Sequence, residues 1–226
     1  MKRSYINQAI DKAYAYFKSY CWSLPPFADF TPEEWQNAGK DYDPVCECML
    51  GWDLTDFGSG DFEKVGLLLF TVRNGRPGSA VHDKPYAEKL MLVRENQKTP
   101  YHFHWYKMED IINRGGGVLK LRFFACDEQE QRVETPVTVL TDGRMVTLQP
   151  EEVLSLRPGE SVTIPRRVYH EFWAEEKDTI VGEVSQVNDD NADNRFYLPA
   201  GRFPAIEEDE APRYLLCNEY PPAQKA

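Results

Sequence analysis

Four side chains stand out because their types and spacing could hold a metal ion. The chain has 4 histidines, and two of them flank one residue in His102-Phe103-His104. Alternation along a β-strand would place both imidazoles on one face. Glu109 follows far enough on to return on a neighbouring strand, and His170 lies in a later predicted strand. Three imidazoles and one carboxylate suit Mn, Fe, Ni, Co or Zn. We therefore predict a metal site built from His102, His104, Glu109 and His170.

The elements that must position these residues are mostly short strands. From about residue 65 onward, apolar runs alternate with Gly- and Pro-rich turns, which is typical of an antiparallel sandwich or barrel. Asp142-Gly143 predicts a type I′ hairpin turn. Two further hairpins are predicted around Arg157-Pro158-Gly159 and Glu175–Asp178. Asp193 and Arg195 fall in a polar loop that could cover the barrel mouth.

The first 40 or so residues show a helical pattern. Apolar residues recur at a spacing of three to four from Ile6 to Tyr20, and Thr31-Pro32-Glu33-Glu34 is a capping box that starts a second, short helix. We predict a helical N-terminal extension over residues 1–60, packed on a barrel over residues 61–226, as one folding unit. The acidic run Glu207–Glu210 is expected to be a solvated loop.

Composition and charge exclude several classes of protein. The formal net charge is −11, so a nucleic acid or an anionic membrane surface would repel the chain. Aromatic residues make up 13% of the sequence, too many for a disordered chain. The longest apolar run, Val65–Val72, is far shorter than the ~20 residues that span a bilayer. The 5 cysteines form no disulfide pattern, and we see no signal peptide, so we expect a cytoplasmic protein with reduced thiols.

The metal-site residues resemble the two sequence motifs of the cupin superfamily. The first motif, H-x-H-x₄-E-x₆-G, is met by His102, His104, Glu109 and Gly116. The second motif, G-x₅-P-x-G-x₂-H-x₃-N, is met by Gly159, Pro165 and His170. Three turn positions depart from these motifs: Asn96, Arg167 and Trp173. The resemblance implies a mainly β fold, a cupin jelly-roll barrel carrying the α-helical N-terminal extension.

Four longer stretches make the resemblance more specific. They are Ala87–Val93, Pro100–His104, Glu183–Ser185 and Asp189–Phe196, and they resemble the D-lyxose isomerase family of cupins. The match covers nearly the whole chain. It implies aldose–ketose isomerisation of D-lyxose to D-xylulose, and often of D-mannose to D-fructose, with Mn²⁺; the same ligands also suit Co²⁺ or Zn²⁺. It implies a small-molecule sugar as the partner, and since cupins often pair through their sheets we expect a homodimer.

Several polar residues could carry this chemistry. Glu183 is the first candidate for the base that moves a proton through a cis-enediol, and we expect burial to raise its pKa. Lys107 and Lys89 could steady negative charge on the sugar oxygens. Asp193 is a further catalytic candidate, and Arg195 is predicted to bind sugar hydroxyls. A metal-mediated hydride shift would need no strong base, and the sequence does not choose between the two routes.

Two other functions use the same ligand set. A cupin dioxygenase or decarboxylase could hold its metal with three histidines and a glutamate, but it would favour an apolar pocket. A non-catalytic sugar-binding cupin would bind the sugar without turning it over. The preferred sugar, the physiological metal and the oligomeric state cannot be read from the sequence.

Overall fold

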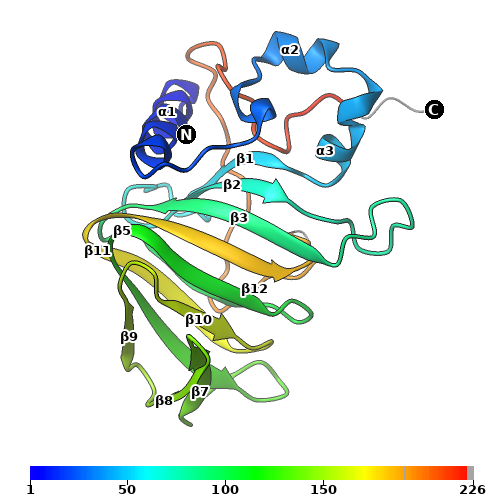
Figure 1. Cartoon of the computed structure of the whole chain (residues 1–226). Coiled ribbons are helices and arrows are strands. Elements are labelled where there is room, and N and C mark those ends of the chain that lie inside the picture. The colour runs from blue at the N-terminus through cyan, green and yellow to red at the C-terminus, as the bar shows by residue number, and fades with distance from the viewer. Residues whose placement is uncertain (191, 223–226) are drawn as a thin grey trace.

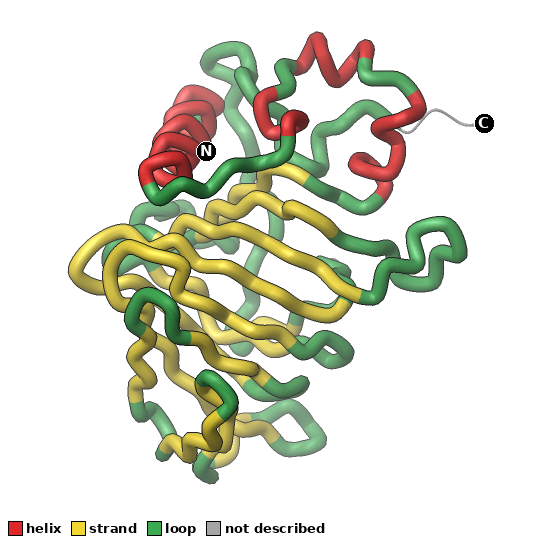
Figure 2. Tube along the Cα trace, in the orientation of Figure 1, coloured by secondary structure: helices red, strands yellow, loops and turns green. Residues whose placement is uncertain are grey.

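Helices occupy the N-terminal part of the chain and strands the rest in the computed structural model, which describes residues 1–190 and 192–222 (Figures 1 and 2). Asn191, in the polar stretch before β12, lies outside the described residues. The helical segments are α1 Arg3–Ser19, η1 Pro26–Asp29, α2 Pro32–Asn37, η2 Lys40–Tyr42 and α3 Asp43–Glu47. The strands are β1 Gly51–Thr55, β2 Leu67–Arg73, β3 Tyr86–Val93, β4 Lys98–Phe103, β5 Glu109–Cys126, β6 Arg132–Val133, β7 Val137–Thr141, β8 Arg144–Leu148, β9 Val153–Leu156, β10 Ser161–Ile164, β11 Tyr169–Gln186 and β12 Arg195–Phe196.

The strands pair antiparallel around two long strands, β5 and β11. The main path runs β1-β2-β3-β11-β5-β10-β7-β8, and β4 pairs with β11 and β12. The first half of β5 pairs with the last part of β11, beside β3 and β10. The second half of β5 pairs with the start of β11, beside β4 and β9. The sheet therefore folds over on itself, and both long strands cross from one half to the other.

The crossing is built on a glycine corner. Gly116 has φ +113°, and a Cβ there would lie 2.3 Å from the carbonyl oxygen of Asp178. A Cβ on Gly117 would lie 2.1 Å from the carbonyl oxygen of Glu175. Opposite them, the β5–β11 register shifts between Glu175 and Thr179, as expected for a bulge that bends a strand. The hairpin predicted around Glu175–Asp178 is therefore wrong, because the segment is a bulge inside one continuous strand.

The other two predicted hairpins have different outcomes. Val137–Thr141 and Arg144–Leu148 pair around Asp142 and Gly143, whose φ angles of 49° and 80° fit a type I′ turn, so that prediction is confirmed. The hairpin predicted around Arg157-Pro158-Gly159 is wrong. Its strands β9 and β10 do not pair with each other but with opposite halves of β5. The turn thus carries the chain across the same corner.

The predicted helices are confirmed, and α1 covers one face of the sheet. Ile6, Ile10 and Phe17 are buried in a cluster with Leu68 and Phe70 of β2. Full burial of each such side chain contributes roughly 1.5–3 kcal/mol. α2 has the predicted capping box, with reciprocal bonds between its cap and Glu34. The first 60 residues also contain β1, which pairs with β2 at the edge of the sheet.

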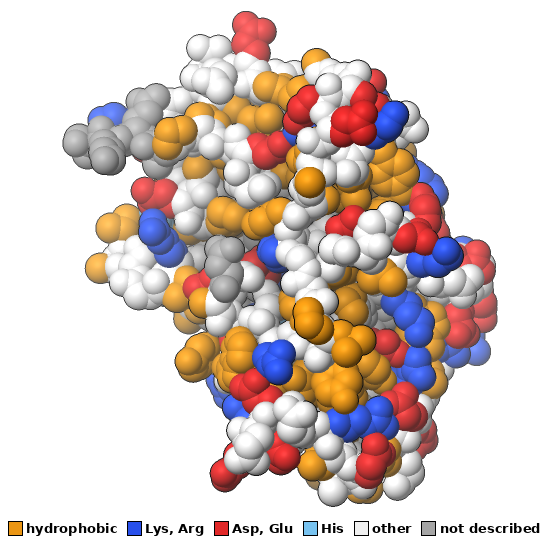
Figure 3. All heavy atoms as spheres, turned by 180° about the vertical axis from the view of Figure 1, so that it is seen from behind, with side chains coloured by type: hydrophobic (Ala, Val, Ile, Leu, Met, Phe, Trp, Pro, Cys, Tyr) orange, Lys and Arg blue, Asp and Glu red, His pale blue; other side chains and the backbone are white. Residues whose placement is uncertain are grey.

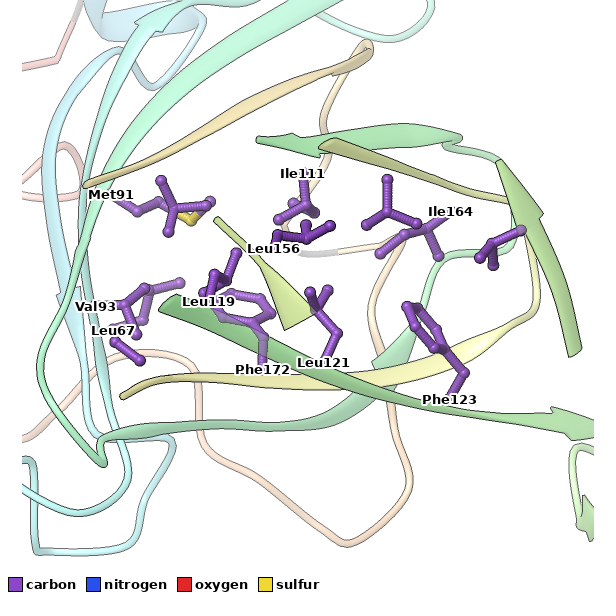
Figure 4. Packing of buried hydrophobic residues seen from close by; sticks show 14 of the residues in the cluster. Leu67, Met91, Val93, Ile111, Leu119, Leu121, Phe123, Leu156, Ile164 and Phe172 are labelled. Carbon is purple, nitrogen blue, oxygen red and sulfur yellow. The ribbon is translucent and has the colours of Figure 1, made fainter. Parts of the chain in front are cut away.

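The second apolar cluster fills the inside of the folded sheet. Alternate residues of β2, Leu67 and Leu69, point inward, where they join Met91, Ile111 and Phe172 (Figure 4). Because one face of β2 packs under α1 and the other lines the interior, the strand reads as a continuous apolar run rather than an alternating one.

The acidic run Glu207–Glu210 is exposed and lies outside the helices and strands, as predicted for a solvated loop, and it also contacts the start of α1. The buried guanidinium of Arg3 ion-pairs with Glu208 at 2.6 Å and with Glu219. Asp209 accepts a hydrogen bond from the backbone N–H of Ser4 at 2.9 Å. It therefore caps the first turn of α1 from across the sequence, where a negative charge is favourable.

Charges of both signs are mixed over the rear face of the molecule (Figure 3). Arg122 and Arg132 both ion-pair with Glu151. Among the described residues, no helix is long and apolar enough to cross a membrane.

We predict that Gly116→Ala lowers the free energy of unfolding by about 2 kcal/mol or more, because the new Cβ meets backbone atoms at a positive φ. Gly143→Ala is the matched control: its φ is +80°, but nothing lies within 4 Å of the added Cβ. Urea unfolding of both variants checks this. Equal losses would show that the corner contact does not matter.

Candidate active site

Two histidines meet across neighbouring strands. His170 of β11 is the register partner of His102 of β4, and their ring centroids are 4.2 Å apart. His104 follows directly after β4 ends at Phe103, and its ring lies 5.9 Å from that of His170. His102 and His104 therefore lie in the same cluster, as predicted, although His104 already belongs to the connection between β4 and β5.

Glu109 completes the cluster from the other half of the folded sheet. It is the first residue of β5, opposite Ser185 of β11. Its Oε1 lies 3.0 Å from Nε2 of His170 and 3.4 Å from Nε2 of His104. One ligand atom from each of the four predicted metal ligands lies within 4.8 Å of all the others, and all four residues are buried. The structure therefore brings together the whole predicted set.

The hydrogen bonds of the three rings leave the same nitrogen of each imidazole facing the cluster. Nδ1 of His102, His104 and His170 lies 2.9, 2.6 and 3.1 Å from the backbone carbonyls of Pro100, Asp193 and Val168, respectively. A carbonyl can only accept, so each Nδ1 carries the proton and each Nε2 keeps a lone pair.

The cluster fits a divalent cation. Nε2 of His104, Nε2 of His170 and Oε1 of Glu109 are buried without a hydrogen-bond partner, an arrangement that is costly unless another group satisfies them. Burial, together with the neighbouring His170 and His104, holds the pKa of His102 well below its usual value. Burial alone would raise the pKa of Glu109, but Lys107 and His104 outweigh it and hold that pKa low. Neutral imidazoles and an ionised carboxylate are the forms that bind metal.

Glu183 lies beside this cluster, between two buried lysines. Lys107 Nζ is 2.8 Å from Oε1 of Glu183 and 3.0 Å from Oε2 of Glu109. Lys89, the cross-strand partner of Glu183, has its Nζ 3.5 Å from Oε2 of Glu183. Glu183 approaches the cluster because β11 bends, and not through the predicted hairpin.

The expected rise in the pKa of Glu183 is wrong in direction. Burial alone would raise this pKa, but the ammonium groups of Lys107 and Lys89 outweigh it, and the pKa lies below its usual value. Glu183 is therefore ionised at neutral pH. Burial would lower the pKa of Lys107, but Glu109 and Glu183 raise it above its usual value, so Lys107 stays cationic.

Asp193 is fixed by the backbone and does not face the cavity. Its carboxylate accepts the backbone N–H groups of Trp105, Tyr106 and Lys107 at 2.7, 2.9 and 2.9 Å. Its own carbonyl accepts from His104. This placement argues against the catalytic role predicted for Asp193 and assigns it to holding the connection between β4 and β5.

Arg195 is also outside the cavity lining, against its predicted contact with sugar. Its Nε donates to Glu130 at 2.7 Å. The arginine that does line the cavity is Arg202, which pairs with buried Asp53 and lies 3.1 Å from Asp190. The sequence offered one signal for Asp190, its place in the polar stretch, and none for Arg202.

Three residues of the metal cluster, His102, His104 and Glu109, line a cavity. Its charged lining, in addition to the cluster residues, consists of Lys89, Lys107, Glu183, Asp190 and Arg202. Its apolar lining includes Leu69, Met91, Ile111, Phe172 and Phe196. Many charged groups converging on one side suit a ligand rich in hydroxyl groups.

The sequence matches the model of the D-lyxose isomerase family over residues 1–220. The chain belongs to this family. A D-lyxose/D-mannose isomerase from Serratia proteamaculans is 49% identical, covering 97% of this chain and 98% of that protein. A D-lyxose/D-mannose isomerase from Escherichia coli O157:H7 is 46% identical with the same coverage. The predicted family is confirmed, and with it the prediction that this protein is a sugar isomerase.

Solved structures of more distant proteins share the fold. The L-ribose isomerase of Acinetobacter sp. DL28, in a mutant form in complex with L-ribose, superposes with a TM-score of 0.60 at 15% identity, over 92% of this chain and 98% of that one. The L-ribose isomerase of Cellulomonas parahominis with L-ribose gives 0.57 at 17% identity, over 89% and 96%. The predicted mainly β cupin barrel with its helical extension is confirmed.

We predict that His170→Ala weakens divalent metal binding by at least about 100-fold, since even loss of a partner behind a ligand costs 10–100-fold. Activity should fall with it. His82→Ala is the control, because His82 lies outside the cluster and contacts Glu47. Metal content after dialysis, measured by elemental analysis, checks this. Full occupancy in the His170 variant would remove that residue from the ligand set.

Proposed function

We propose that this sugar isomerase interconverts D-lyxose and D-xylulose, and also D-mannose and D-fructose, with Mn²⁺ held by His102, His104, Glu109 and His170; Co²⁺ or Zn²⁺ would fit the same ligands. The observation that carries the proposal is the position of Glu183. It is an ionised, buried carboxylate beside the cluster, in a cavity with two cationic lysines. The relatives named D-lyxose/D-mannose isomerase support the choice of sugars.

A divalent ion in the cluster would supply Lewis acidity toward two adjacent oxygens of the sugar. The protein's own residues then move the proton. Glu183 takes the proton from C2 and returns it to C1, while the hydroxyl proton of the C2 oxygen moves to the C1 oxygen. The electron pair of the broken C–H bond forms the C1–C2 double bond of a cis-enediolate, and the π pair of the C1 carbonyl moves onto the C1 oxygen as its negative charge. When the proton returns to C1, that double-bond pair forms the new C1–H bond and the C2 oxygen becomes the ketone, so atoms and charge balance.

Lys107 and Lys89 favour this transfer by their fixed charges. Before it, their ammonium groups stabilise the carboxylate of Glu183. When Glu183 accepts the proton, its negative charge disappears and negative charge grows on the sugar oxygens. The same two ammonium groups, already desolvated and oriented, then stabilise the oxygens. A base that is ionised at neutral pH also favours proton transfer over a hydride shift, which needs no base.

We predict that Glu183→Gln lowers kcat by at least about 100-fold, the usual contribution of a positioned base. Metal content should stay unchanged, because Glu183 is outside the metal cluster. Exposed Glu128→Gln is the control, with the same loss of one charge. Steady-state assays of D-lyxose conversion check this. Wild-type turnover in the Glu183 variant would remove it from the role of base.

A second prediction separates the two routes. In D₂O, a proton held by Glu183 exchanges with solvent, so the isomer formed over many turnovers should carry deuterium at the carbon that receives it. A hydride shift moves the hydrogen directly and would introduce none. Mass spectrometry and NMR of the product measure the difference, and a product free of deuterium at full conversion would exclude Glu183 as proton carrier.

We also propose that the protein works in the cytoplasm as a homodimer. Its 5 cysteines are all unpaired, which suits a reducing compartment. Tyr86 of β3, Val184 of β11 and Met108, which directly precedes β5, are exposed and line one groove, so this face could be covered by a second copy. Light scattering on the purified protein gives the oligomeric state directly.

A further inference from the structure

The two active-site lysines share one acceptor besides Glu183. The side-chain oxygen of Asn188 lies 2.9 Å from Nζ of Lys89 and 3.2 Å from Nζ of Lys107. The carboxylate of Glu183 contacts the same two ammonium groups, Lys89 through Oε2 and Lys107 through Oε1. The four side chains thus form a closed ring in which cations and acceptors alternate.

The Asn188 side chain offers this acceptor without a charge. An amide oxygen accepts from both ammonium groups and stays neutral. Aspartate of similar size would add a negative charge at the same point, and leucine would offer no acceptor.

Asn188 is held in place by a second buried asparagine. Its backbone N–H donates to Oδ1 of Asn74 at 2.9 Å, and its carbonyl accepts from Nδ2 of Asn74 at 3.0 Å. The same Nδ2 lies 3.4 Å from the carbonyl of Cys48. Asn74 follows β2 and Asn188 follows β11, and both are buried. This two-bond bracket fixes the chain just after β11 against the segment after β2.

From these contacts we propose that Asn188, bracketed by Asn74, is a positioning residue for the isomerisation. It holds Lys89 and Lys107 apart and aimed at Glu183 without adding negative charge of its own. The neutral acceptor matters because a further carboxylate here would offset the two ammonium charges that stabilise the negative charge developing on the sugar. The inference rests on the proposed role of Glu183 as the base.

Asn188→Asp tests it with a change of one group. The new carboxylate would neutralise one cation of the ring. We expect kcat for D-lyxose to fall at least 10-fold, with KM changing less than kcat and with unchanged metal content and thermal midpoint. The isotope effect with C2-deuterated D-lyxose should rise, since slower chemistry exposes it, whereas a partly misfolded sample would leave it unchanged. Exposed Asn96→Asp is the charge-matched control.

A kcat within 2-fold of wild type in Asn188→Asp would overturn the inference. If that variant does not fold, Asn74→Ser decides, because it breaks the bracket without adding charge; we expect a kcat loss of about 3-fold or more there, and wild-type kcat would overturn the inference. The Glu183→Gln variant distinguishes failure of the positioning role from failure of the proposed function. If it is inactive while Asn188→Asp is fully active, only the positioning role fails; if it is active, the proposed function fails first.

Discussion

The site depends on the fold-over of the β5–β11 ladder. His102 and His170 belong to one half of the sheet, and Glu109 and Glu183 belong to the other. In a flat sheet, the thirteen or so residues between His170 and Glu183 would separate them by roughly 40 Å at the rise of a strand. The bend at Gly116 and Gly117 instead brings the two halves of the sheet together. A position such as Gly116 is therefore as necessary to the chemistry as the ligands, although it touches none of them.

The fold-over also imposes an electrostatic condition. Charged groups buried inside a barrel are costly unless they are paired. The described cavity and its border hold three cations, Lys89, Lys107 and Arg202, against the carboxylates of Asp53, Glu109, Glu183 and Asp190. The anions exceed the cations by one, so the protein alone leaves a negative centre. A divalent cation held by the histidines would reverse that balance to a net positive one, which suits the proposed reaction, in which negative charge develops on the sugar.

The features that the sequence could predict are those that depend on residues close together in the chain. Helix α1, the capping box of α2 and the Asp142-Gly143 hairpin depend on neighbours in the chain, and all three were predictable. The strand pairs around Arg157-Pro158-Gly159 and Glu175–Asp178 were not. Their residues resemble turns, and in the structure each one takes the chain round the corner of the barrel, a role set by β5, which lies far away in sequence.

The same division holds for the site. The H-x-H spacing and the later histidine identify a ligand set because metal chemistry restricts residue type. Polar residues whose role depends on where the fold places them have no comparable signal in the sequence. Asp193 and Arg195 have the right side chains, yet their partners are backbone N–H groups and Glu130. Asn188 is an unremarkable amide in the sequence, and only its contacts with two lysines give it a place in the mechanism.

The helical extension has a part in the site through the C-terminal segment. After Arg202 enters the cavity lining, the chain passes α1, where the acidic run binds Arg3 and Ser4. It then reaches β1, where the N–H of Cys217 donates to the carbonyl of Trp52 at 2.7 Å. The segment that follows Arg202 is thus held by two contacts with the N-terminal part of the chain, one with α1 and one with β1. Arg202 itself pairs with Asp53 of the same β1. The helices do not touch the reacting atoms, but they hold the segment that supplies the third cation of the cavity.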